Sequence, residues 1–68
     1  MTSAIFMMAK KAGVTLGIVM LTTDMVHINA RLADKQICRR MTMTEIDDAQ
    51  FDILEETVYQ MIREIKRA

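Results

Sequence analysis

A single cysteine in a chain of only 68 residues is the feature that most constrains this fold. A domain of this size buries only about 60% of its unfolded surface, so disulfides, a bound metal or a partner commonly add stability. One cysteine excludes an intrachain disulfide. One cysteine and one histidine together are too few ligands for a structural metal site. We therefore expect one small domain, residues 1–68, that is stabilised by protein partners.

The second constraint is the scarcity of turn signals, because the chain has no proline and only two glycines, Gly13 and Gly17. Few enforced turns favour long continuous elements, and helices above many-stranded sheets. Apolar residues make up 51% of the chain, which excludes disorder. The net charge is zero, so no overall charge draws the protein to nucleic acid or membrane. The lone thiol, Cys38, fits a reducing compartment, and we expect a cytoplasmic protein.

The C-terminal segment is predicted to be an amphipathic helix over about 45–67. Thr44 and Asp47 resemble a capping box, acids crowd the first half of the segment, and bases crowd its last turns. Apolar residues recur there at spacings of three and four, which is the pattern of a coiled-coil seam. This stripe comprises Phe51, Leu54, Val58, Met61 and Ile65.

The segment 24–41 has two interpretations. As a helix, it places Val26, Ala30, Ala33 and Ile37 on one stripe. As a strand, it alternates apolar and polar residues over 26–32, and residues 14–21 alternate in the same way. The second interpretation leads to an α+β fold with a β-hairpin from residues 14–32 and a long C-terminal helix.

Charge spacing favours the helical interpretation. If the chain turns near residue 43, the small apolar residues of 24–41 face the large ones of 45–67. The same register also brings bases opposite acids, pairing Arg39 with Asp48, Lys35 with Asp52 and Arg31 with Glu56. We therefore predict an all-α protein, an antiparallel helical hairpin of 24–41 and 45–67 that assembles into a helical bundle.

The N-terminal segment 1–21 is more apolar than that hairpin can bury. An exposed apolar arm of this size is unusual on a monomer, so we expect residues 1–21 to mediate assembly, as a homo-oligomer or within a larger complex. The expected partner-facing residues are Ile5, Ala9, Ala12, Leu16, Val19 and Val26. Two alternatives remain open: Gly13 ends a short first helix as a C-terminal cap, or residues 12–28 belong to a single membrane span.

No motif for catalysis, cofactor binding or metal binding is present. His27 and Cys38 would lie about 16 Å apart on one helix, too far to share a metal. Arg31, Lys35, Arg39 and Arg40 would line one helix face, which makes a dimeric nucleic-acid-binding regulator an alternative. The expected function is that of a non-enzymatic adaptor, regulator or accessory subunit that acts through helix–helix contacts and self-association. A membrane accessory protein is the other alternative.

Overall fold

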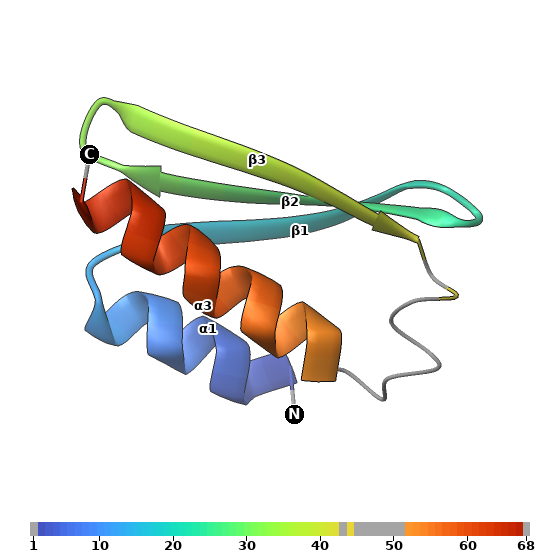
Figure 1. Ribbon diagram of the computed structural model, residues 1–68, viewed down its shortest axis with the longest axis horizontal. Coiled ribbons are helices and arrows are strands. Elements are labelled where there is room, and N and C mark those ends of the chain that lie inside the picture. The colour runs from blue at the N-terminus through green and yellow to red at the C-terminus, as the bar shows by residue number, and fades with distance from the viewer. Residues whose placement is uncertain (1, 43, 45–51, 68) are drawn as a thin grey trace.

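In the part of the chain that the structure describes, the protein is a two-layer α+β structure with the helices α1 and α3 covering one face of a three-stranded sheet (Figure 1). The computed structural model describes residues 2–42, 44 and 52–67, with side chains from residue 4 onward. Its elements in chain order are α1 (Thr2–Lys11), β1 (Thr15–Thr22), β2 (Met25–Leu32), β3 (Lys35–Thr42) and α3 (Asp52–Arg67).

The sheet is an antiparallel meander with β2 in the centre and β1 and β3 at the edges. Two-residue loops connect the strands, as the pairs Thr22 with Met25 and Leu32 with Lys35 show. Along β2, Val26, Ile28 and Ala30 are buried and alternate with residues that face away from the helices. This period-two alternation is expected for a strand that packs on one face only.

The predicted helical hairpin is therefore wrong, because residues 24–41 form β2 and most of β3. The physical reason is backbone pairing: three adjacent strands pair in one ladder and bury Ile28, which the helical stripe would have left out. The alternative fold is closer, since β1 and β2 form the hairpin expected over 14–32. That alternative did not include β3, and the coiled-coil interpretation fails with the hairpin.

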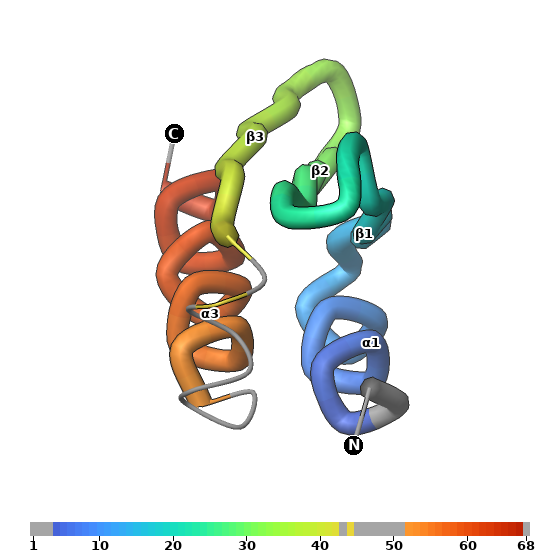
Figure 2. Tube along the Cα trace, turned by 90° about the vertical axis from the view of Figure 1, so that its right-hand side faces the viewer, coloured from blue at the N-terminus to red at the C-terminus, as the bar shows by residue number. Residues whose placement is uncertain are grey.

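The core lies between the sheet and the two helices. Figure 2 shows α1 below β1 and α3 beside it, toward β3. The side chains that are almost completely buried come from both helices and the central strand, and the largest of them are Ile5, Ile28, Val58, Met61 and Ile65. The chain thus packs one face of α1 against its own sheet, through Ile5 and Ala9.

Gly13 ends α1 with a Schellman motif, which was one of the alternatives for this glycine. The Val14 amide donates to the Ala9 carbonyl at 2.9 Å, and the Gly13 amide donates to the Lys10 carbonyl at 3.0 Å. Gly13 has a φ of 76°, and both Val14 and Ala9 are buried. The cap therefore turns the chain from α1 directly into β1.

The loop between β2 and β3 places a non-glycine residue, Ala33, at a φ of 56°. A Cβ atom is strained in this region, and the first residue of a two-residue hairpin loop is commonly glycine. We predict that Ala33→Gly raises the free energy of unfolding by about 0.5–1 kcal/mol, measured by urea denaturation. The control is Ala4→Gly at an exposed position inside α1, where the same substitution should lower stability by a similar amount. Destabilisation by both variants would contradict the strain at Ala33.

Candidate interaction surface

The edge strand β1 carries the most exposed apolar residues of the sheet. Its sequence TLGIVMLT contains no charged residue. Val19, Met20 and Leu21 are consecutive, and 58%, 57% and 47% of their surfaces are exposed. A long uncharged apolar edge strand is a ready template for pairing with another strand. We call residues 15–22, together with the unpaired side of their backbone, the β1 edge.

The other edge strand, β3, differs in its charge. It carries Lys35, Arg39 and Arg40, and none of its eight residues is acidic. Charged side chains on an edge strand oppose pairing with further strands. Arg39 also donates to Glu64 of α3 at 2.6 Å, which ties this edge to the helix layer. The two edges of the sheet are thus unequal, and the β1 edge is the one suited to pairing.

The helix α1 adds an apolar side chain below the β1 edge. Phe6 is 39% exposed and lies on the opposite side of α1 from Ala4 and Lys11, which face α3. Helical spacing therefore places Phe6 on the flank of α1 that faces away from α3, and Figure 2 shows α1 below β1. The pairing of β1 with β2 shifts register between Met20 and Thr22, so the regular part of the edge is Thr15–Met20.

The sheet face away from the helices is mainly polar. The Asn29 carboxamide oxygen accepts hydrogen bonds from Gln36 Nε2 at 2.7 Å and from Cys38 Sγ at 3.3 Å. His27 Nε2 is buried and has no hydrogen-bond partner among the residues that the structure describes; the cross-strand neighbours of His27 are Val19 and Arg40. Among the residues that the structure describes, no three His, Cys, Asp or Glu side chains are grouped so that they could hold a metal ion.

The structure distributes the predicted partner-facing residues between the core and the surface. Ile5, Ala9 and Val26 are buried in the chain's own core, and Ala12 and Leu16 are partly buried against it. Only Val19 is largely exposed, and it lies in the middle of the β1 edge.

The residues expected to close the helical hairpin are also dispersed. Leu54, Val58, Met61 and Ile65 lie on the buried face of α3, where they pack against the sheet and not against a second hairpin helix. Ala30 is buried on β2, and its cross-strand partner Ile37 is partly buried. Ala33 lies in the β2–β3 loop. Phe51, the predicted capping-box residue Asp47 and the expected Arg39 partner Asp48 lie outside the described residues.

The basic stripe expected on one helix face is divided between two faces of the sheet. Lys35 and Arg39 are each two residues from Ile37, so these side chains share one face of β3. Ile37 and Met41 pack toward the core, and Lys35 and Arg39 therefore also lie on the helix side of the sheet. Arg31 and Arg40 lie on the opposite side, as their register across from Gln36 and His27 requires. The expected partner of Arg39 was Asp48, whereas the structure pairs it with Glu64.

Sequence reasoning missed Phe6, Met20 and Leu21 as surface residues. The available signal was the absence of any charge over 15–22, which typifies an edge that is not protected against pairing. The helical interpretation of this segment predicts which side chains are exposed from a period of 3.6 residues. In a strand the period is two, and the exposed set is therefore different.

Residues 12–28, the candidate membrane segment, form the Gly13 cap, β1 and part of β2. Within the described ranges, no helix has both the length and the apolar character needed to cross a bilayer. Comparison of the chain with protein-family models, with curated proteins and with solved structures found no match.

Proposed function

We propose that this protein is a non-enzymatic assembly subunit that self-associates by pairing its β1 edge with the β1 edge of a second copy. The observation that carries the proposal is the run of exposed apolar residues Val19–Leu21 on an edge strand without charge. Strand addition at a sheet edge obtains its affinity from main-chain hydrogen bonds, which this edge offers along Thr15–Met20.

A second copy is the partner that fits the edge best. Pairing β1 with β1 brings no charged side chains together, whereas pairing β1 with β3 would place Arg39 and Arg40 beside the apolar run. Antiparallel pairing about a two-fold axis gives a closed dimer with one continuous sheet. The helices of both copies then lie on the same side of that sheet, and Phe6 of each copy faces the joint.

This arrangement also accounts for the stability expected of so short a chain. The sequence provides neither an intrachain disulfide nor a metal site of its own. Pairing would add main-chain hydrogen bonds along the β1 edge, each worth about 0.5–1.5 kcal/mol net, and would shield part of the apolar surface of Met20. The proposal thus places assembly in the N-terminal third of the chain, through the strand β1. Assembly through helix–helix contacts is not proposed.

The test is the mass of the protein in solution, measured by light scattering. The natural chain should have the mass of two chains, and Met20→Lys should have the mass of one. Met20 faces the helix side of the edge, as its partner Val26 does, so a lysine there reaches water only when no further strand covers it. We expect the substitution to weaken pairing at least tenfold, about 1.4 kcal/mol.

Ile53→Lys is the matched control, because Ile53 is an exposed apolar residue of α3 that lies away from the β1 edge. It should leave the mass at two chains, and circular dichroism should show both variants folded. A natural chain that stays monomeric at all concentrations, or equal dissociation of the two variants, would reject the proposal.

A further inference from the structure

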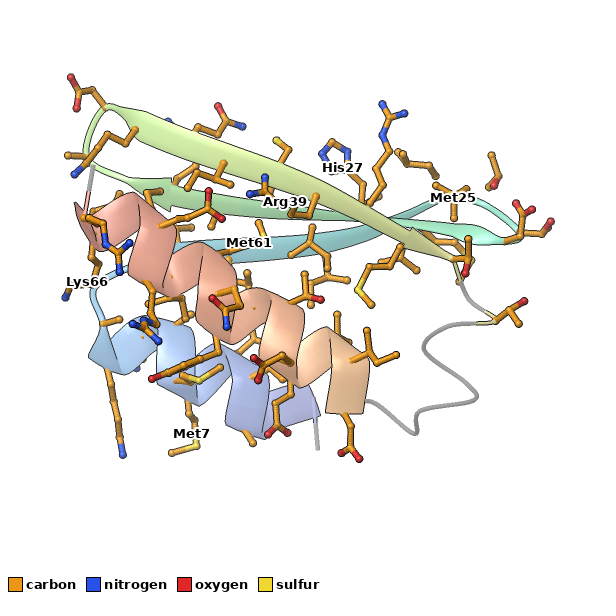
Figure 3. The ribbon with its side chains drawn as sticks, viewed as in Figure 1. Met7, Met25, His27, Arg39, Met61 and Lys66 are labelled. Carbon is orange, nitrogen blue, oxygen red and sulfur yellow. The ribbon has the colours of Figure 1, made fainter. Side chains whose placement is uncertain are left out.

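The outer surface of the helix layer contains an apolar groove between α1 and α3. The groove has a volume of about 600 Å³, within the range of small-molecule sites. Its lining is supplied by both helices and comprises Ala4, Met7, Met8, Lys11, Ala12, Tyr59 and Ile62. Figure 3 shows Met7 projecting from α1 on the side away from the sheet. The groove thus lies on the far side of the helices from the sheet.

The charged side chain that lines this groove is a cation. Lys11 lines it directly, and no carboxylate is among its lining side chains in the described part of the chain. Arg63 lies 5.7 Å from the centre of the Tyr59 ring, and Lys66 donates to the Ala12 carbonyl at 3.0 Å. Glu64, the acid between these two bases, is held by Arg39 on the sheet side of α3. The apolar groove is therefore bordered by cations where the two helices end.

We propose that this groove binds a fatty carboxylate, with the alkyl chain against the methionines and the carboxylate near Lys11. Methionine side chains adapt to flexible apolar ligands, and Met7 and Met8 provide two of them on one helix. Lys11 supplies a cation at the rim, which an anionic head group needs. An acid without an alkyl chain would leave the apolar groove unfilled. A neutral alkyl compound would make no ion pair with Lys11.

Tyr59 makes the groove directly observable, because it is the only tyrosine and the chain has no tryptophan. The probe is decanoate below its critical micelle concentration, titrated into the full chain with tyrosine emission and isothermal calorimetry as readouts. We expect saturable binding of one decanoate per chain. Decanol, with the same chain and no charge, and acetate, with the same head group and no chain, should both bind more weakly.

Matched lysine variants test the position of the head group. Lys11→Met should weaken decanoate binding two- to fivefold, the size expected for an exposed charge pair. Lys10→Met removes an equal charge from the neighbouring position, which does not line the groove, and should change binding less than twofold. Met7→Glu places a carboxylate in the groove and should weaken binding more than tenfold.

Three results would overturn the proposal: no saturable response to decanoate, equal losses in the Lys10 and Lys11 variants, or a lower solution mass for Met7→Glu. The last result would mean that a second copy occupies the groove. Met20→Lys, which targets the β1 edge, should bind decanoate as the natural chain does. Binding by this variant keeps the groove proposal independent of the proposed self-association.

Discussion

Ile65→Ala is expected to lower the free energy of unfolding by about 2–5 kcal/mol. Ile65 is completely buried on α3, within the single core that joins both helices to the sheet. Truncation leaves a cavity, and the tightly packed neighbours cannot close it without moving a helix. A chain of 68 residues has a total stability on the order of 3–10 kcal/mol, so this loss is a large fraction of the whole.

Urea denaturation followed by circular dichroism measures this effect. It is to be done at one fixed protein concentration, because self-association would couple to folding. Ile53→Ala makes the same chemical change on the same helix, at a position that is 43% exposed. It should cost less than about 1 kcal/mol, because alanine is also the better helix former. Similar losses in the two variants would contradict the burial of Ile65.

Gly13→Ala is expected to lower the free energy of unfolding by about 1–2 kcal/mol. The cause is backbone conformation alone, since a Cβ atom built on Gly13 has nothing within 4 Å. At a φ of 76° an alanine is strained, and relief of that strain would break the two hydrogen bonds of the cap. Urea denaturation followed by circular dichroism measures this loss.

Gly17→Ala is the matched control for this glycine. Gly17 lies in β1 without a positive φ, and an added Cβ atom would meet only the Asn29 carbonyl oxygen at 4.0 Å, an ordinary contact. Stability should stay the same or rise by up to about 1 kcal/mol, because alanine loses less backbone entropy on folding. A loss in Gly17→Ala as large as that in Gly13→Ala would show that conformation is not what distinguishes the two sites.

The C-terminal helix illustrates what local sequence can determine. Its apolar residues recur at helical spacing, its acids precede its bases, and α3 spans Asp52–Arg67 with Leu54, Val58, Met61 and Ile65 buried. These signals are all contained within one element, so no knowledge of its neighbours was needed. The cap at Gly13 was likewise available as an alternative, because glycine after two lysines is a common helix end.

The middle of the chain shows where such reasoning fails. The sequence of residues 24–41 fits both a helical stripe and a period-two alternation. Opposite charges at matching positions of 24–41 and 45–67 favour the helical interpretation. Those charges are exposed and worth little each, whereas the ladder joins three strands of eight residues each through backbone hydrogen bonds that form together. Strand pairing is a property of segments distant in the chain, so no single segment reveals it.

The prediction of the interaction surface also depended on whether residues 24–41 form helices or strands. From sequence, the apolar excess of residues 1–21 indicated contact with other protein, and Val19 was among the residues named. Once the middle of the chain formed a sheet, one face of that sheet required cover, and α1 supplied part of it with Ile5 and Ala9. Among the large apolar side chains that the structure describes in this segment, Phe6, Met7 and Val19–Leu21 of the β1 edge are left exposed.

The sequence by itself determined that these residues hold no intrachain disulfide, that the C-terminal segment is an amphipathic helix, and that the N-terminal third is apolar. Each of these follows from composition or from the period of a single segment. The tertiary structure alone decided that the middle is a sheet, that one face of the N-terminal helix is needed for its core, and that the uncharged strand β1 lies at an edge. The reason is physical: which side chains are exposed depends on which strands pair and which face the helices cover.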